Sequence, residues 1–104
     1  VWFQYDDSAS SQWQTVTRKN GTKELQNTAV NVAASETYFT LEARRIGSEE
    51  YHFYINGTLA TTHTASAPSS ASNYFAVILE KSIGSTLRGI AIDSVEIVNP
   101  LTRT

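Results

Sequence analysis

The alternation of apolar and polar residues is most regular around an Asn-Gly pair in the middle of the chain. Residues 51–55 carry Tyr51, Phe53 and Ile55 at every second position, and the polar segment 58–63 follows Asn56-Gly57. Both central residues of a type I′ turn need positive φ, and Asn-Gly meets this requirement best. The pattern predicts a hairpin in which Ile55 pairs with Thr58 and His52 pairs with Thr61.

A second Asn-Gly pair predicts another hairpin near the start of the chain. Asn20-Gly21 lies between residues 13–18 and 22–26, which mix β-branched, aromatic and polar side chains. Such segments favour strands.

Three further segments have strand character. Residues 38–46 alternate, with Phe39, Leu41 and Ala43 on one side, which predicts a strand with one solvated face. Residues 76–79 are apolar at every position, which indicates a central strand.

The last of these segments, residues 89–98, changes phase between Ile92 and Val95. Either a bulge at Asp93-Ser94 keeps its apolar residues on one face, or the strand has two mixed faces.

These strands, with no helical apolar spacing, predict an all-β fold with antiparallel sheets stacked as a β-sandwich. The length of 104 residues allows a single domain over residues 1–104.

Charge and composition narrow the range of partners. The net charge is −2 and the pI is about 5.6, so the basic surplus of a nucleic-acid-binding protein is absent from the sequence. No apolar run reaches the roughly 18 residues of a membrane-spanning helix, so we expect a soluble chain without membrane insertion. The sequence contains no cysteine, which excludes disulfides and thiolate metal sites.

Two stretches of sequence resemble a known family. Residues 53–61 read Phe-Tyr-Ile-Asn-Gly-Thr-Leu-Ala-Thr, and residues 88–97 read Arg-Gly-Ile-Ala-Ile-Asp-Ser-Val-Glu-Ile. Residues 38–98 resemble the C-terminal half of concanavalin A-like lectin/glucanase (LamG-like) jelly-roll domains of the kind found in bacteriophage virion proteins. The resemblance implies a jelly-roll sandwich and a place on a virion or in the extracellular space.

The chain is short for that family, whose domains are nearly twice as long. The sequence has no methionine and starts at Val1, so we expect it to be the C-terminal part of a larger domain or protein. Either the strands form a compact smaller sandwich, or another segment or chain completes the sheets.

Catalytic and metal chemistry find little support in the sequence. A glucanase of this fold places two carboxylates at alternate positions of one strand, whereas Asp93 and Glu96 are three residues apart. His52 and His63 lie in the two arms of one hairpin, where a diagonal metal pair is conceivable but lacks a third ligand. Asp6-Asp7 with Ser8 could offer oxygens to calcium, although adjacent carboxylates in a loop are commonly only solvated. We therefore expect no enzyme, no metal and no cofactor.

Aromatic residues give the best binding signal, because their rings stack on sugars and anchor protein interfaces. Tyr54 lies on the face opposite Phe53 and Ile55, and together with Asn73 and Tyr74 it forms the candidate ligand site. We expect the core to be filled by the other large rings: Trp2, Phe3, Phe39, Phe53 and Phe75.

Two functions follow from these features. The first is a non-enzymatic virion structural or appendage module, such as a decoration or fibre domain, that binds other virion proteins or copies of itself. The alternative is a lectin-like carbohydrate-binding module that adheres to a host or glycan.

Overall fold

The computed structural model describes residues 1–6, 10–32, 38–68, 92 and 94–96. The chain divides into two compact units, Val1–Ser72 and Asn73–Thr104. All strands of the described residues belong to the first unit, and the described part of the chain contains no helix.

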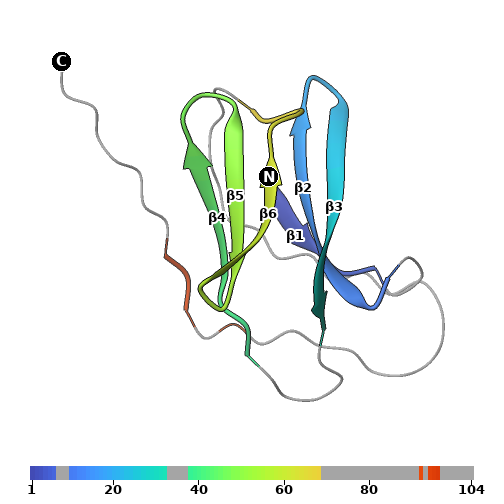
Figure 1. The fold of residues 1–104 in the computed structure, drawn as a ribbon, viewed down its shortest axis with the longest axis vertical. Helices are drawn as coiled ribbons and strands as arrows, with labels where there is room; N and C mark the ends of the chain where they lie inside the picture. The colour runs from blue at the N-terminus through green and yellow to red at the C-terminus, as the bar shows by residue number, and fades with distance from the viewer. Residues whose placement is uncertain (7–9, 33–37, 69–91, 93, 97–104) are drawn as a thin grey trace. The chain divides into compact units, whose positions relative to one another are not determined.

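Six strands form two antiparallel three-stranded sheets (Figure 1). The first sheet has the order β1 (Trp2–Gln4), β2 (Gln12–Lys19) and β3 (Thr22–Asn31). The second has the order β4 (Leu41–Ile46), β5 (Glu50–Ile55) and β6 (Thr58–His63). The expectation of an all-β, antiparallel fold is confirmed.

Both Asn-Gly turns form where the sequence predicts them. Asn20 and Gly21 have φ of 52° and 80°, and Asn56 and Gly57 have the same two values. Positive φ at both central residues is the geometry of a type I′ turn, whose twist matches the flanking strands. β2–β3 and β5–β6 are therefore hairpins.

The register of the second hairpin differs from the prediction by one residue. Ile55 pairs with Thr58 as expected, but the register shifts between Phe53 and Tyr54, so that His52 pairs with Thr62 and not with Thr61. Such an irregularity opposes two residues on one strand to one on its partner. Its consequence is that His63 lies opposite Tyr51, on the other face of the sheet from His52.

The strand predicted over residues 38–46 begins later and is more exposed than expected. β4 starts at Leu41, and all six of its residues are exposed. Leu41 and Ala43 pair with Ile55 and Phe53, so they lie on the predicted face. The expectation that this face is covered along β4 is wrong, because β4 is the outermost strand of its sheet among the described residues.

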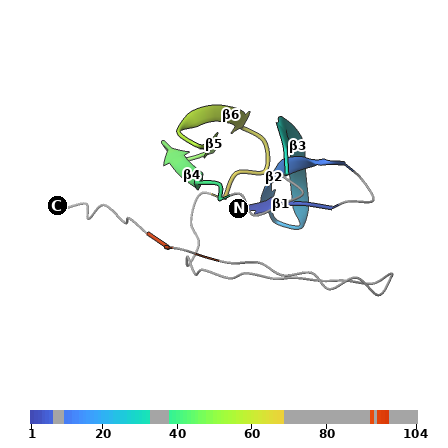
Figure 2. The same cartoon turned by 90° about the horizontal axis from the view of Figure 1, so that it is seen from below.

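The inner faces of the two sheets meet along β6. The Phe3 and Phe53 rings contact edge to face, with centroids 5.2 Å apart, and Phe53 also packs against His63 at 4.9 Å. Side chains of β6 bond to β2, and the main chain of β6 accepts a hydrogen bond from Gln26 of β3. In Figures 1 and 2, β6 is accordingly the strand of its sheet that lies beside the first sheet.

The expected aromatic core forms only in part. Phe53 is buried, and Phe3 and Phe39 are half-buried, but Trp2 is 37 % exposed, so its assignment to the core is wrong. Trp2 pairs with Val16 on the face of the first sheet opposite to Phe3, and this face is covered at Val16, which is fully buried, but not at Trp2. Phe75 lies outside the described residues.

The final predicted strands fall mostly outside the described residues, including 76–79. Within 89–98, Ile92 and Val95 are described, and they are 50 % and 49 % exposed without strand structure. The strand expected over residues 89–98 is therefore not formed at Ile92 and Val95, so neither the bulged strand nor the strand with two mixed faces is present at these two positions.

Candidate functional site

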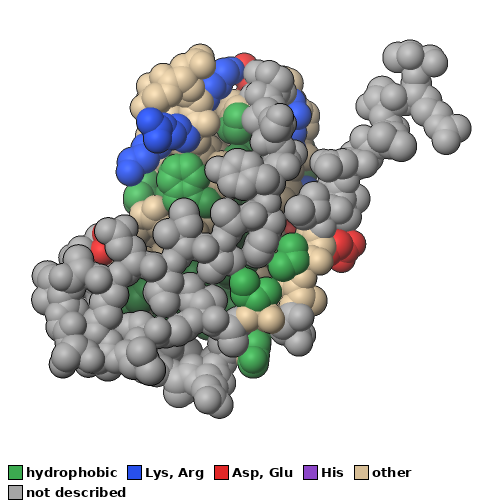
Figure 3. Space-filling view, turned by 180° about the vertical axis from the view of Figure 1, so that it is seen from behind, with side chains coloured by type: hydrophobic (Ala, Val, Ile, Leu, Met, Phe, Trp, Pro, Cys, Tyr) green, Lys and Arg blue, Asp and Glu red, His purple; other side chains and the backbone are tan. Residues whose placement is uncertain are grey.

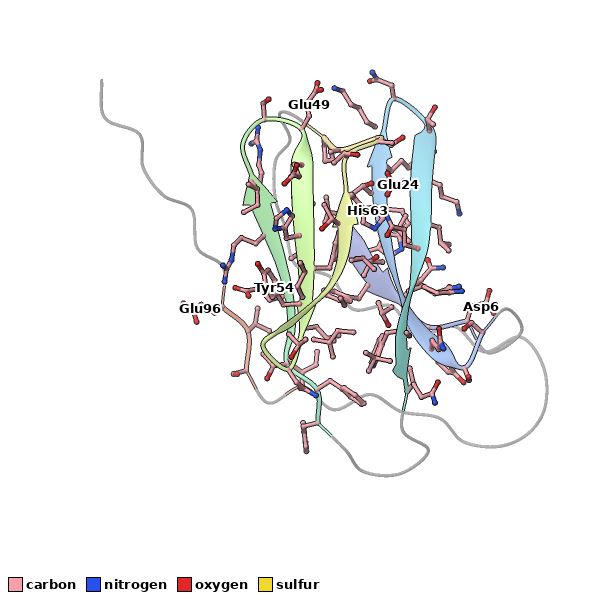
Figure 4. The ribbon with its side chains drawn as sticks, in the orientation of Figure 1. Asp6, Glu24, Glu49, Tyr54, His63 and Glu96 are labelled. Carbon is pink, nitrogen blue, oxygen red and sulfur yellow. The ribbon has the colours of Figure 1, made fainter. Side chains whose placement is uncertain are left out.

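The predicted ligand site is described at one of its three residues. Tyr54 is half-buried in β5, whereas Asn73 and Tyr74 lie outside the described residues. Figure 4 shows the position of Tyr54 on the second sheet.

The Tyr54 ring has a guanidinium group over one face. The Arg44 Cζ atom lies 4.7 Å from the ring centroid, a cation–π distance. Arg44 Nη2 donates to both carboxylate oxygens of Glu42, at 3.0 and 3.1 Å, and these bonds together with the charge of Glu42 raise the pKa of Arg44. The neighbours on β4 thus cover one face of the ring predicted to stack on a ligand.

Among the described strands, the one that carries Arg44 lies at the edge of its sheet. The side chains of Leu41 and Ile46 are 36 % and 38 % exposed, although both are apolar. Leu41, Ala43 and Arg45 lie on the same face as the buried Phe53 and Ile55, whereas Ile46 lies on the opposite face. The face that is covered at β5 is thus exposed at Leu41 and Ala43. We call residues Leu41–Ile46 the β4 edge.

Exposed hydrophobic side chains also occur elsewhere, in several separate places in the view of Figure 3. Scattered exposed residues of this kind are normal on a protein surface. The β4 edge differs from them because its exposed residues belong to one continuous strand.

A buried polar cluster joins the two sheets around His63. Its members are Thr15 and Thr17 of β2, Glu24 of β3, and Thr61 and His63 of β6 (His63 and Glu24 are labelled in Figure 4). Thr15 Oγ1 lies 2.8 Å from His63 Nε2 and 2.7 Å from Thr61 Oγ1. On the other side of the ring, His63 Nδ1 lies 3.0 Å from Thr17 Oγ1 and 3.0 Å from Glu24 Oε2.

The environment of His63 favours its neutral form. The side chain is fully buried, and burial lowers the pKa of His63, while the Glu24 carboxylate opposes this by raising it. A charged imidazolium loses its hydration when buried, which is the reason for the direction of the shift.

The order hydroxyl, imidazole, carboxylate in this cluster is also that of a catalytic triad. Thr15, in the place of the nucleophile, is fully buried between the sheets, and its hydroxyl is bonded to Thr61 as well as to His63. The Thr15 hydroxyl is thus buried, and the hydrogen bonds of the cluster join β2 to β6 across the two sheets.

A row of amide side chains crosses the face of the first sheet that carries Trp2 and Val16. Trp2 Nε1 donates to Gln4 Oε1 at 2.9 Å, Gln4 Nε2 to Gln14 Oε1 at 3.0 Å, and Gln14 Nε2 to Asn27 Oδ1 at 2.9 Å. Gln14 is buried, whereas Trp2 and Asn27 at the two ends of the row are exposed. This Trp2–Asn27 row presents an indole beside fixed amide groups.

Sequence reasoning missed both the buried cluster and the Trp2–Asn27 row. The signal for the first is the alternation of Thr15 and Thr17 about Val16, and the signal for the second is the pair Gln12 and Gln14 at alternate positions. Neither pattern shows which residues of other strands complete the set.

Within the described ranges, no group of three or more His, Asp or Glu side chains is arranged to hold a metal ion. The diagonal pairing of His52 with His63 is wrong, because the register shift places them on opposite faces. Asp6 and Glu96 are described and exposed, whereas Asp7, Ser8 and Asp93 lie outside the described residues. The same part of the chain has no helix of the length and apolarity needed to cross a membrane.

Comparison with known proteins gives no match. No family model, no curated protein and no solved structure matches it.

Proposed function

We propose that this chain is a non-enzymatic structural module that acts through protein–protein contacts, with the β4 edge as its contact surface. The observation that carries the proposal is the exposure of Leu41 and Ala43 on the sheet face where Phe53 and Ile55 are buried. This face is covered at β5 and uncovered at β4, so another polypeptide could cover Leu41 and Ala43.

The exposed edge supports the same function. An edge strand offers main-chain N–H and C=O groups to any chain that approaches it, and natural proteins either protect such edges or use them for pairing. The β4 edge carries Glu42, Arg44 and Arg45, and charged residues of this kind limit indiscriminate pairing. Such an edge is therefore better suited to pairing with a specific partner than to nonspecific aggregation.

The resemblance to phage jelly-roll domains supports a contact function on a virion or in the extracellular space. In this proposal the two sheets are the layers of a jelly-roll sandwich, and the partners are other virion proteins or copies of the chain itself. The support for the sandwich is the contact between the inner faces of the sheets, from Phe3 to Phe53 and from Thr15 to Thr61.

A photo-crosslinking amino acid tests the contact surface. We expect it to form protein adducts when it replaces Leu41 on the β4 edge, in the chain produced by its native source. Lys23, which is exposed on β3, is the matched control position and is expected to give none. Adducts at position 23 but not at position 41 would contradict the proposal.

Carbohydrate binding is the second candidate, and the Trp2–Asn27 row favours it. Sugar-binding surfaces combine an aromatic ring that stacks on the apolar face of a sugar with fixed polar groups that bond its hydroxyls. Trp2 supplies the ring, and Gln4 and Asn27 supply amides whose orientation is fixed by hydrogen bonds.

Glycan-array screening of the full chain, followed by titration calorimetry, tests this second function. We expect Trp2→Ala to abolish binding, whereas Tyr38→Ala removes an equally accessible ring, 67 % exposed, and leaves binding unchanged. An array without signal for the folded protein would dismiss carbohydrate binding.

A further inference from the structure

The main-chain N–H and C=O groups of β4 point alternately toward β5 and away from it. Asn56 N donates to Thr40 O at 2.8 Å, so Thr40 directs its main-chain groups toward β5. In an antiparallel ladder every second residue does the same, and the residues between them point to the other side. Glu42 and Arg44 therefore face β5 with their main chain, whereas Leu41 and Ala43 direct theirs away from it.

The side chains on the outer face of β4 carry opposite charges at alternate positions. Glu42 and Arg44 are two residues apart, with Ala43 between them, and they already form an ion pair at 3.0 Å within the chain. A two-fold axis through Ala43 would bring Glu42 of each copy opposite Arg44 of the other. The strand is thus complementary to itself in charge.

Resting on the proposed contact function, we infer that the β4 edge pairs in antiparallel register with the β4 edge of a second copy of this chain, about a two-fold axis at Ala43. Ala43 then faces Ala43 of the second copy as a hydrogen-bonded pair, because both direct their main chain outward. Glu42 and Arg44 of the second copy form a non-hydrogen-bonded pair, the kind in which side chains approach most closely. The β4–β5–β6 sheets of the two copies then form one continuous sheet of six strands.

Neighbouring registers fail on charge or on hydrogen bonding. An axis at Glu42 would oppose two carboxylates, and an axis at Arg44 would oppose two guanidinium groups, which destabilises a strand pair. An axis midway between two residues would set outward main-chain groups against inward ones and leave them unbonded. The register centred on Ala43 satisfies both requirements.

Charge exchange tests the register. We expect the wild-type chain to be dimeric in sedimentation velocity, and Glu42→Arg or Arg44→Glu alone to weaken the dimer about tenfold or more, since each opposes like charges twice. The double variant Glu42→Arg/Arg44→Glu restores complementarity and the homodimer. An equal mixture of the two single variants forms the heterodimer, which native mass spectrometry identifies by mass.

Cysteine cross-linking tests the axis directly. The chain contains no cysteine, so Ala43→Cys introduces a single thiol. The two copies of this thiol would belong to Cα atoms about 5.5 Å apart, within disulfide range. We expect rapid oxidation to a covalent dimer, and only slow, collisional cross-linking for Ser48→Cys in the exposed turn after β4.

These experiments distinguish a failure of the β4 pairing from a failure of the proposed contact function. A wild-type chain that stays monomeric at millimolar concentration overturns the inference, and adducts of another protein at position 41 then leave the contact function standing. A dimer that ignores the charge exchanges, or that fails to cross-link through Ala43→Cys, also overturns it. A monomer without adducts at position 41 overturns both.

Discussion

The two flanks of the β4–β5–β6 sheet, β4 and β6, lie in opposite environments. At β6, His63 is fully buried and bonded to Thr15 and Thr17 of the other sheet. At β4, every residue is exposed, including Leu41, which lies on the same inner face. The difference shows that alternation determines which way a side chain points, whereas burial depends on what lies across from it.

The largest expected effect comes from truncating the covered region. Phe53→Ala should lower the free energy of unfolding by about 3–5 kcal/mol, because it empties a fully buried site that contacts Phe3 and His63. Leu41→Ala on the β4 edge is expected to change it by less than about 0.5 kcal/mol in the monomer. Urea unfolding at low protein concentration measures both, and equal losses would remove the contrast between the flanks.

A smaller effect is expected from the buried hydroxyl that joins the sheets. Thr15→Val leaves His63 Nε2 and Thr61 Oγ1 without their shared partner, at a cost of about 1–3 kcal/mol. Thr62→Val makes the same change on the exposed face of β6, where about 0.5 kcal/mol or less is expected. If both variants unfold at the same urea concentration, the cluster does not stabilise the contact between sheets.

Acid should loosen the β6 flank through His63. The folded-state pKa of His63 is lowered from 6.5, so the unfolded chain binds the proton more readily. The stability that neutral His63 contributes is complete above pH 6.5 and is lost as the pH falls from there toward the folded-state pKa. Glu24, on β3, is the carboxylate that faces the ring and limits the loss.

Urea midpoints at about pH 7.5 and about pH 5.5 measure this dependence. His63→Gln should flatten the decline, whereas His52→Gln, on the opposite sheet face, should retain it. A decline of equal size in both variants would assign the pH dependence to other groups.

The smallest expected effect is at the tips of the strands, where Lys19 Nζ and Glu49 Oε1 form an ion pair at 3.0 Å between the two sheets. Lys19→Gln should cost about 0.2–1 kcal/mol, because both side chains are partly exposed. About 0.5 M NaCl should abolish the difference from wild type. Lys23→Gln serves as the control and should have no effect at either salt concentration.

Local features of the fold could be predicted because short-range chemistry determines them. The Asn20-Gly21 and Asn56-Gly57 turns form because few other residue pairs accept positive φ twice in succession. The strands that flank them follow from their side chains. The register shift at Phe53 and Tyr54 has no comparable local signal in the sequence. The predicted partner of His52, Thr61, is therefore one residue away from the observed partner, Thr62.

The relations between the sheets could not be predicted in the same way. Residues 15 and 63 are far apart in sequence, and nothing in either segment indicates that a threonine hydroxyl meets a histidine ring. The Trp2–Asn27 row combines three strands, so no single segment reveals it. Of the predicted ligand residues, Tyr54 lies on the expected face, but the guanidinium over its ring depends on the pairing of β4 with β5.

The charge pattern of β4 has a consequence for the size of any assembly. A contact with two-fold symmetry uses the same surface of both molecules. Once two copies have paired, neither has this surface left for a third copy, so the assembly is limited to a dimer. Because Glu42 and Arg44 also neutralise each other within a solitary chain, separation leaves no orphaned charge on either half. A dimer of this kind can dissociate and reassociate without starting a fibre.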